Sequence, residues 1–142
     1  MSDTFDLVVI GSGPGGYIGA IRAAQLGLKT AVIEKDSTFG GTCLNVGCIP
    51  SKALLESSEL YHKLNHDIED HGLTVGKVKL DLAKMMERKS KIVSDLTGGI
   101  KYLFEKNKIT AFNGLGSIKS PTEVTVALND GSTKNLTTKN IM

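Results

Sequence analysis

The residue types and patterns that this sequence lacks exclude several classes of function. The chain of 142 residues has no tryptophan and only two cysteines, and its 17 basic and 15 acidic side chains leave a formal charge of +2. The basic residues form no cluster, and the three tyrosines are not interleaved with basic runs, which argues against a nucleic-acid partner. No apolar run approaches the roughly 20 residues that cross a bilayer. We therefore expect partners other than nucleic acid or membrane.

The first residues of the chain bear on its expected compartment. Residues 1–4, Met-Ser-Asp-Thr, resemble neither a secretory signal peptide nor an arginine-rich transit sequence. Sparse cysteine suits a reducing compartment. We expect a bacterial cytoplasm, with the mitochondrial matrix as the alternative for a processed chain. The length is that of one domain with one core.

Both cysteines lie in a glycine-rich stretch, residues 40–52, and four residues separate them. That spacing is too wide for the C-x₂-C of a zinc or thioredoxin site. An extended five-residue step would hold the two Cα atoms roughly 17 Å apart, whereas a disulfide needs about 4.4–6.8 Å. Pairing of Cys43 with Cys48 thus requires the segment to fold back. Asn45 and Gly47, which tolerate left-handed backbone angles, are expected to allow this reversal.

A helix is expected directly after the second cysteine. Pro50 fits a first helical turn, and residues 51–64 read as helical. The dipole of such a helix favours the thiolate of a cysteine at its N-terminus. We interpret Cys43 and Cys48 as a redox-active pair. Two alternatives remain on the cysteines alone: buried inert thiols, or a static structural bridge.

Residues 5–34 read as strand, glycine turn, helix and strand. The apolar residues 5–10 suit a strand buried on both faces. The turn that follows matches G-x-G-x-x-G, in which Gly11 allows the tight turn, Gly13 lets the backbone approach a pyrophosphate, and Gly16 lets the helix sit close to the strand. The helix N-terminus favours phosphate, and Gly27 stands where a C-cap glycine would.

The second strand of this unit ends in an acid. Glu34 follows Gly16 by eighteen residues and is placed to accept hydrogen bonds from a ribose hydroxyl. Only six residues separate Glu34 from Gly41, at the start of the cysteine segment. Hydride does not pass directly from a nicotinamide to a disulfide, whereas a flavin accepts electrons from a dithiol and returns them to a nicotinamide. We therefore predict FAD as the cofactor.

The remainder of the chain predicts one long helix and a β region. Asp81 is a candidate cap for a helix whose apolar residues recur every three to four positions, and we favour core packing over a coiled coil for them. In the final third, Asn113-Gly114 is a turn signal and residues 124–128 alternate. We predict an α/β, Rossmann-like FAD-binding fold with a parallel sheet, long helices and a small antiparallel β layer laid over it. His62 and His66 share a helix face without a third ligand, so we predict no metal site.

The cysteine segment and its flanks also carry a family resemblance. Residues 40–55 resemble the active-site sequence of the pyridine nucleotide–disulfide oxidoreductases, most closely of the members that oxidise protein-bound dihydrolipoamide. Members that act on glutathione or mercury share the cysteine spacing but usually have Val where this chain has Leu44 and Ile49. The resemblance extends through residues 114–116 to residue 141.

The resemblance implies a role for each matching residue. Cys43 would exchange with the dihydrolipoyl substrate and Cys48 would face the flavin. Lys52 would lie near the reactive flavin nitrogen, Thr42 near the phosphates and Gly116 near the adenine end. The predicted cofactor-binding residues are Gly11, Gly13, Gly15, Gly16, Glu34, Lys35, Gly41, Thr42, Cys43, Lys52 and Gly116.

The resemblance also implies a larger parent protein. Residues 1–142 would be the N-terminal part of its FAD-binding domain, with the NAD-binding and dimerisation domains outside them. The parent would be a homodimer that uses NAD and serves the dihydrolipoyl domains of 2-oxoacid dehydrogenase complexes. We expect residues 1–142 alone not to complete that reaction. The alternatives are another FAD-dependent disulfide reductase and a non-catalytic domain fragment.

Overall fold

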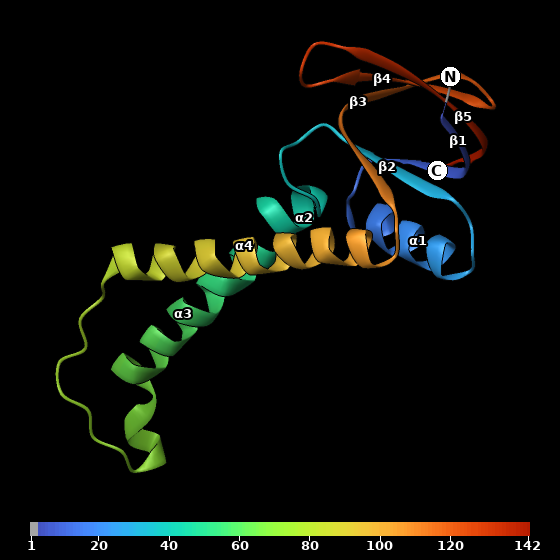
Figure 1. Ribbon diagram of the computed structural model, residues 1–142. Helices are drawn as coiled ribbons and strands as arrows, with labels where there is room; N and C mark the ends of the chain where they lie inside the picture. The colour runs from blue at the N-terminus through green and yellow to red at the C-terminus, as the bar shows by residue number, and fades with distance from the viewer. Residues whose placement is uncertain (1–2) are drawn as a thin grey trace.

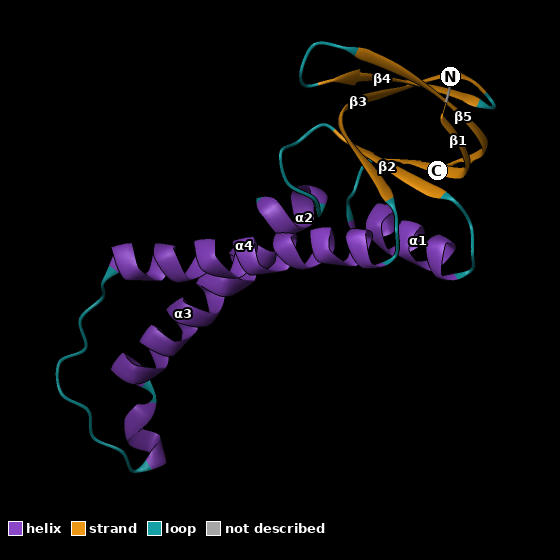
Figure 2. Cartoon of the chain, in the orientation of Figure 1, coloured by secondary structure: helices purple, strands orange, loops and turns teal. Residues whose placement is uncertain are grey.

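The computed structural model describes residues 3–142, and its helices lie on one side of a ring of strands (Figures 1 and 2). In chain order the elements are β1 Asp3–Ile10, α1 Pro14–Gln25, β2 Thr30–Glu34, α2 Gly41–Asn45, α3 Cys48–His66, the 3₁₀ turn η1 Ile68–His71, α4 Leu82–Lys106, β3 Thr110–Ser120, β4 Glu123–Leu128 and β5 Thr133–Ile141.

The strands close on themselves in the order β1-β2-β3-β4-β5. Strand β1 is parallel to both β2 and β5, and β2 is parallel to β3. Strand β4 runs antiparallel to β3 and β5 and completes the ring. The predicted Rossmann-like α/β fold, with its parallel sheet, long helices and antiparallel β region, is confirmed.

The predicted turn at Asn113-Gly114 is wrong, because both residues lie within strand β3. The strand runs on without a turn and changes partner there, since Asn113 pairs with Glu34 of β2 whereas Gly114 pairs with Leu128 of β4. A Cβ on Gly114 would overlap the carbonyl oxygen of Ala127. This glycine therefore serves a close approach of two strands. The antiparallel region is accordingly continuous with the parallel sheet and is not a separate layer laid over it.

The core lies on both faces of the parallel strands. Alternation along β1 sends Val8 into one hydrophobic cluster and Val9 into another, as expected of a strand buried on both faces. The cluster inside the ring draws on every strand and consists of Phe5, Val8, Ala31, Ile33, Phe112, Val124, Val126 and Leu136. The cluster between strands and helices consists of Val9, Ala20, Val32, Phe39, Leu44, Ile100, Phe104 and Ile109.

Helix α1 packs on the sheet through small residues. Ala20 and Ala23 are buried, whereas Ile18 is exposed. Gly27 has a φ of +87° just beyond the C-cap, which is the left-handed conformation that glycine adopts there. The predicted C-cap is thus confirmed, and the short side chains let the glycine turn lie close to β1.

Helices α3 and α4 form a hairpin that extends away from the strands (Figure 1). Asp81 caps α4 as predicted, because its carboxylate accepts a hydrogen bond from the backbone N–H of Lys84 at 2.9 Å. Core packing holds only near the sheet, where Ile100 and Phe104 are buried. Farther out, Leu82 is exposed, so the helical periodicity there does not mark a core.

None of the helices within residues 3–142 is both long enough and apolar enough to cross a bilayer.

Candidate functional site

The glycine turn after β1 has the geometry of a phosphate cradle. Gly11 has a φ of +94°, and a Cβ on Gly16 would overlap the carbonyl oxygen of Gly11. Both positions therefore require glycine to join strand to helix this tightly. A Cβ on Gly13 or Gly15 would instead meet no atom within 4 Å. The outer side of the turn is open, beside the N-terminus of α1, as close approach by a phosphate demands.

Glu34 is a buried carboxylate at the end of β2, only 4% exposed. One of its oxygens accepts hydrogen bonds from the backbone N–H of Ser12, at 2.9 Å, and from the Ser12 hydroxyl. The other accepts from the backbone N–H of Asp36 at 3.1 Å.

Those donors keep Glu34 ionised. Burial by itself raises the pKa of this carboxyl, but the Ser12 side-chain and backbone donors, with the backbone N–H groups of Asp36 and Lys35, outweigh it. The resulting pKa lies below the ordinary value for glutamate. An ionised, pre-oriented carboxylate is the group that a ribose hydroxyl would find most favourable as an acceptor.

A cavity of about 130 Å³ adjoins Glu34 at the ends of β1 and β2 and along β3. It is smaller than the roughly 300–1,000 Å³ of whole-ligand pockets, so it has room for only part of a ligand of that size. Four predicted cofactor residues meet in its wall: Gly11, Glu34, Lys35 and Gly116. A Cβ on Gly116 would lie 3.2 Å from side-chain atoms of Ile10 and Ile33, which leaves little room for a larger residue.

The two cysteines are joined by a disulfide. Cys43 lies in α2, Cys48 is the first residue of α3, and their Cα atoms are 4.7 Å apart. The expected pairing is therefore present, and free inert thiols are excluded as its alternative. Cys48 is exposed and Cys43 half-buried, so the bridge is accessible for thiol exchange. Pro50 lies in the first turn of α3, as predicted.

Neither residue predicted to reverse the chain has a left-handed φ, since Asn45 is helical and Gly47 has a φ of −115°. Gly47 does lie between the two helices, where α2 ends and α3 begins. The left-handed φ values of this segment precede the cysteines, at Gly40 (+105°) and Gly41 (+60°). The helical turn α2 itself brings the cysteines together. The amide of Asn45 supports that turn by donating to the carbonyls of Phe39 and Gly41.

The disulfide segment is packed against the glycine turn. A Cβ on Gly41 would lie 2.7 Å from the Cα of Gly13. The backbone N–H of Gly40 donates to the carbonyl of Ser12 at 3.0 Å and to the Ser12 hydroxyl at 3.1 Å. The sequence motif gave no sign of Ser12, because it occupies a position that G-x-G-x-x-G leaves free.

Other predicted residues surround this junction. Thr42 is exposed at the beginning of α2, and Lys52 is exposed one turn after Cys48 on α3. Lys35 is exposed and, as noted, lines the cavity beside Glu34. The site is thus assembled from the loops after β1 and β2, the start of α3 and the middle of β3.

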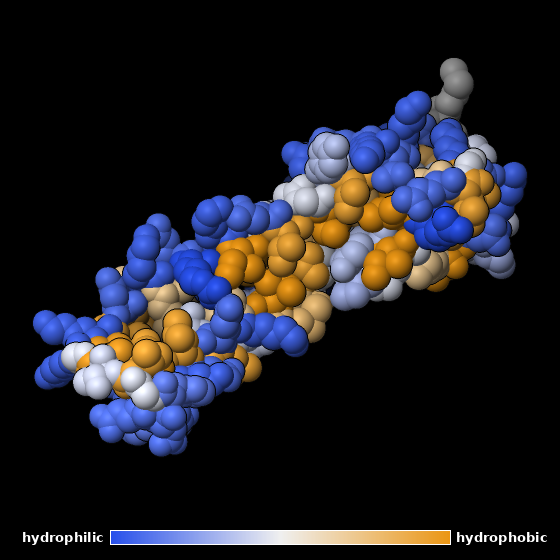
Figure 3. Space-filling view, turned by 90° about the horizontal axis from the view of Figure 1, so that it is seen from below, coloured by the Kyte–Doolittle hydropathy of each residue, from blue (hydrophilic) through white to orange (hydrophobic). Residues whose placement is uncertain are grey.

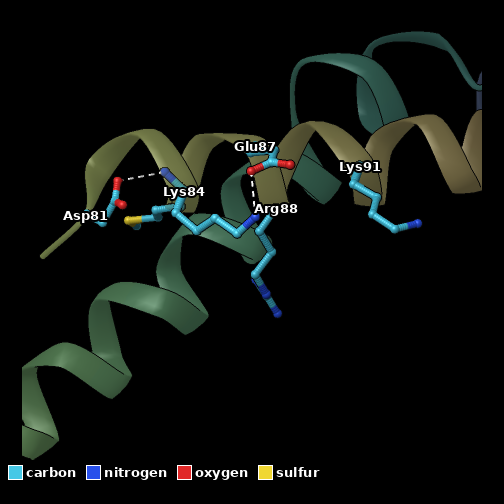
Figure 4. A pocket seen from close by; sticks show the side chains of 6 residues that line it. Asp81, Lys84, Glu87, Arg88 and Lys91 are labelled. Atoms are coloured by element: carbon cyan, nitrogen blue, oxygen red, sulfur yellow. Dashed lines mark hydrogen bonds and ion pairs between the residues drawn. The ribbon is translucent and has the colours of Figure 1, made fainter.

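A larger cavity, of about 450 Å³, lies elsewhere, along the outer half of α4 (Figure 4). Its wall holds ion pairs such as Lys84 with Glu87 at 2.7 Å. Arg88 is turned to α3, where it donates to the carbonyl of Ala53 and to the carboxylate of Glu56. These charges have structural partners within the hairpin. Within residues 3–142, no group of three or more His, Cys, Asp or Glu side chains is arranged to hold a metal ion.

Comparison with known proteins shows the family to which this chain belongs. The sequence profile of the pyridine nucleotide-disulphide oxidoreductases matches residues 5–142. The chain belongs to this family. The Rossmann-like α/β fold and the accessible disulfide described above agree with that membership.

Similar members of the family include plant and animal enzymes. A leghemoglobin reductase of Vigna unguiculata is 58% identical over 130 residues, which cover 92% of this chain and 25% of that protein. The mitochondrial dihydrolipoyl dehydrogenase of Pisum sativum is 57% identical over 130 residues, 92% of this chain and 26% of that protein. That of Sus scrofa is 56% identical over 138 residues, 96% of this chain and 27% of that protein. The chain thus spans about a quarter of the length of these relatives.

Proposed function

We propose that residues 1–142 are the N-terminal part of the FAD-binding domain of a dihydrolipoyl dehydrogenase. The observation that carries the proposal is the accessible Cys43–Cys48 disulfide fixed beside a tight glycine turn whose outer side is open. The similarity to dihydrolipoyl dehydrogenases over more than nine-tenths of the chain supports the same conclusion. The whole protein would oxidise protein-bound dihydrolipoamide with NAD as the final acceptor.

The residues present fit FAD. The open side of the glycine turn, with Gly13 and Gly15, would receive the diphosphate, and Thr42 would lie near it. Glu34 would accept hydrogen bonds from the adenosine ribose, and the cavity along Gly116 would take the adenine end. When bound, FAD would supply a two-electron acceptor for the reduced cysteine pair.

The protein's own part of the reaction is a pair of thiol–disulfide exchanges. A substrate thiolate attacks the sulfur of Cys43, the Cys43–Cys48 bond breaks, and Cys48 leaves as a thiolate that the N-terminus of α3 stabilises. The second substrate thiolate then attacks the substrate sulfur of the mixed disulfide and releases Cys43. The substrate becomes a disulfide and loses two electrons, while its two protons pass through solvent to the protein sulfurs.

The proposal extends to partners and compartment. The substrate would be carried by dihydrolipoyl domains of 2-oxoacid dehydrogenase complexes, and the whole protein would be a homodimer with its NAD site outside residues 1–142. Lys52 would lie near the flavin. The mitochondrial matrix suits the names of the relatives, and a bacterial cytoplasm is the alternative.

Anaerobic spectroscopy tests the proposal. The purified chain, mixed with FAD and gel-filtered, should retain an oxidised flavin spectrum that bleaches when dihydrolipoamide is added. The Cys43→Ser variant should retain flavin without bleaching. Failure of the wild-type chain to retain flavin would favour a non-catalytic fragment, and faster bleaching by a dithiol unrelated to lipoamide would favour another disulfide reductase.

A mass measurement tests the cysteine chemistry separately. Alkylation of the folded chain should leave both cysteines unmodified before reduction and modify both after it, with a two-hydrogen mass difference between oxidised and reduced protein. Two thiols that remain freely alkylated after oxidant treatment would contradict a redox-active pair.

A further inference from the structure

Ser12 is an enclosed polar residue at the junction of the nucleotide turn and the disulfide segment. Its side chain is 0% exposed. Its backbone N–H and its hydroxyl both donate to the same carboxylate oxygen of Glu34. On its other side, the hydroxyl and the carbonyl of Ser12 both accept from the backbone N–H of Gly40. One residue therefore contacts both halves of the proposed site.

The chemistry of this position calls for a hydroxyl. A buried polar group is costly unless its hydrogen bonds are made, and the Ser12 hydroxyl makes one as donor and one as acceptor. Its proton is directed to the Glu34 carboxylate, which leaves an oxygen lone pair for Gly40. Alanine would remove both bonds at once.

The two contacted residues control different parts of the site. Glu34 ends β2 and lines the cavity beside the glycine turn. Gly40 is the N-cap of α2, and its carbonyl accepts the backbone N–H of Leu44 at 3.4 Å. Helix α2 holds Cys43, so the position of Gly40 sets where the disulfide begins.

We propose that Ser12 is a positioning residue that ties the Glu34 carboxylate to the N-cap of α2, so that the cofactor acid and the disulfide form one rigid unit. The proposal rests on the proposed function only in naming a ribose as what Glu34 holds. The mechanical link itself involves residues of this chain alone and is measurable without cofactor.

The first experiment is a redox titration of the cofactor-free chain. Wild type, Ser12→Ala and Thr30→Val are equilibrated with glutathione and quantified by alkylation and mass spectrometry. Thr30 is the matched control, because it also loses a buried hydroxyl, bonded to the Leu28 carbonyl, but at the opposite end of β2. Of the two hydroxyl bonds that Ser12→Ala removes, the one from Gly40 leads to the disulfide. Its loss should favour the dithiol by about two- to tenfold, as expected for one hydrogen bond, and Thr30→Val should not shift the equilibrium. Equal shifts in the two variants, or none in Ser12→Ala, would overturn the proposal.

Amide exchange of the wild-type chain keeps the test independent of whether a variant folds. The Gly40 amide should exchange as slowly as the amides of β2 and much more slowly than those of the exposed residues 35–38. Exchange of Gly40 at the rate of residues 35–38 would show that Ser12 does not hold it, and would also overturn the proposal.

Added FAD separates this proposal from the proposed function. If FAD binds the wild-type chain, it should slow exchange at Gly40, and it should do so less in Ser12→Ala. Binding without any change at Gly40 would refute the link. If FAD does not bind at all, the proposed function fails, while the redox titration and the cofactor-free exchange still decide the role of Ser12.

Discussion

The strand ring and the α3–α4 hairpin differ in how they hold their side chains. In the core of the ring, Ile33 and Leu136 are 1% exposed, as is Phe104 at the inner end of α4, and the buried polar residues Ser12 and Glu34 bond each other. In the outer part of the hairpin, Leu60 is 59% exposed and Leu82 is 60% exposed. Hydrophobic surface is visible along the molecule out to the hairpin end (Figure 3).

This difference shows where side-chain positions are fixed most closely. Close packing fixes positions in the ring and in the loops that leave it, and the candidate site is built there and at the adjoining start of α3. The hairpin is instead joined across its two helices by polar links such as those of Arg88. Four predictions test the comparison.

The largest effect is expected from core truncation. Phe104→Ala removes a ring that contacts Phe39 edge to face, with centroids 5.0 Å apart, and should lower the free energy of unfolding by about 3–5 kcal/mol. Leu60→Ala, in the hairpin, should change it by about 0.5 kcal/mol or less. Urea unfolding measures both. Similar losses would mean that the hairpin is packed as tightly as the ring.

The next effect concerns the site in the ring. Under the proposed function, Glu34→Gln replaces a charge-assisted acceptor with a neutral one and should weaken FAD binding by about 10- to 150-fold, equivalent to about 1.5–3 kcal/mol. Fluorescence titration of FAD checks this value, with Glu59→Gln as the exposed hairpin control. Unchanged affinity in Glu34→Gln would remove Glu34 from the cofactor site.

Acid should act on the same carboxylate. The pKa of Glu34 is lower in the folded chain than its ordinary value of 4.5, because its hydrogen-bond donors outweigh burial. An unfolded chain therefore binds this proton more readily, so the stabilisation by Glu34 is full above about pH 4.5 and is lost as the pH falls through the lower folded value. Unfolding measured between neutral and acidic pH should show this loss in wild type and show less of it in Glu34→Gln. If the stability of wild type and of Glu34→Gln fell equally with acid, Glu34 would not be the carboxylate responsible.

The smallest effect is expected at the hairpin seam. Arg88→Met removes hydrogen bonds to the Ala53 carbonyl at 3.1 Å and to the Glu56 carboxylate at 2.6 Å, and should cost about 0.5–1.5 kcal/mol. Amide exchange should accelerate in α3 beyond Ala53 but not in β1. Lys91→Met is the control, since it removes an exposed pair with Asp95 within α4 worth about 0.3–0.5 kcal/mol. Acceleration in β1 would show that the hairpin and the ring are not independent.

The parts of the molecule that the sequence predicted correctly depend on neighbours in the chain. The glycine turn, the C-cap at Gly27 and the cap at Asp81 are local backbone requirements with few alternative residues. The proximity of Glu34 to the cysteine segment also followed from a short connection. Gly11 and Glu34 were drawn from these same local signals and Gly116 from the family resemblance, and the structure brings the three around one cavity.

The errors and omissions concern contacts between distant residues. Asn113-Gly114 has the composition of a turn, but the meeting of β3 with β4 makes it the point where a strand changes partner. Leu82 belongs to the apolar repeat of α4, which is typical of a helix packed in a core. Whether a given turn of α4 is buried depends on whether it lies against the sheet, and the turn of Leu82 does not.

By itself, the sequence determined the glycine turn, the acid at the end of β2 and the close spacing of the two cysteines, because each is a local pattern with its own chemistry. The tertiary structure alone decided that Ser12 bonds Glu34 and Gly40 together. A serine at a free motif position carries no local signal. Its hydroxyl acquires partners only when residues 22 and 28 positions away fold against it.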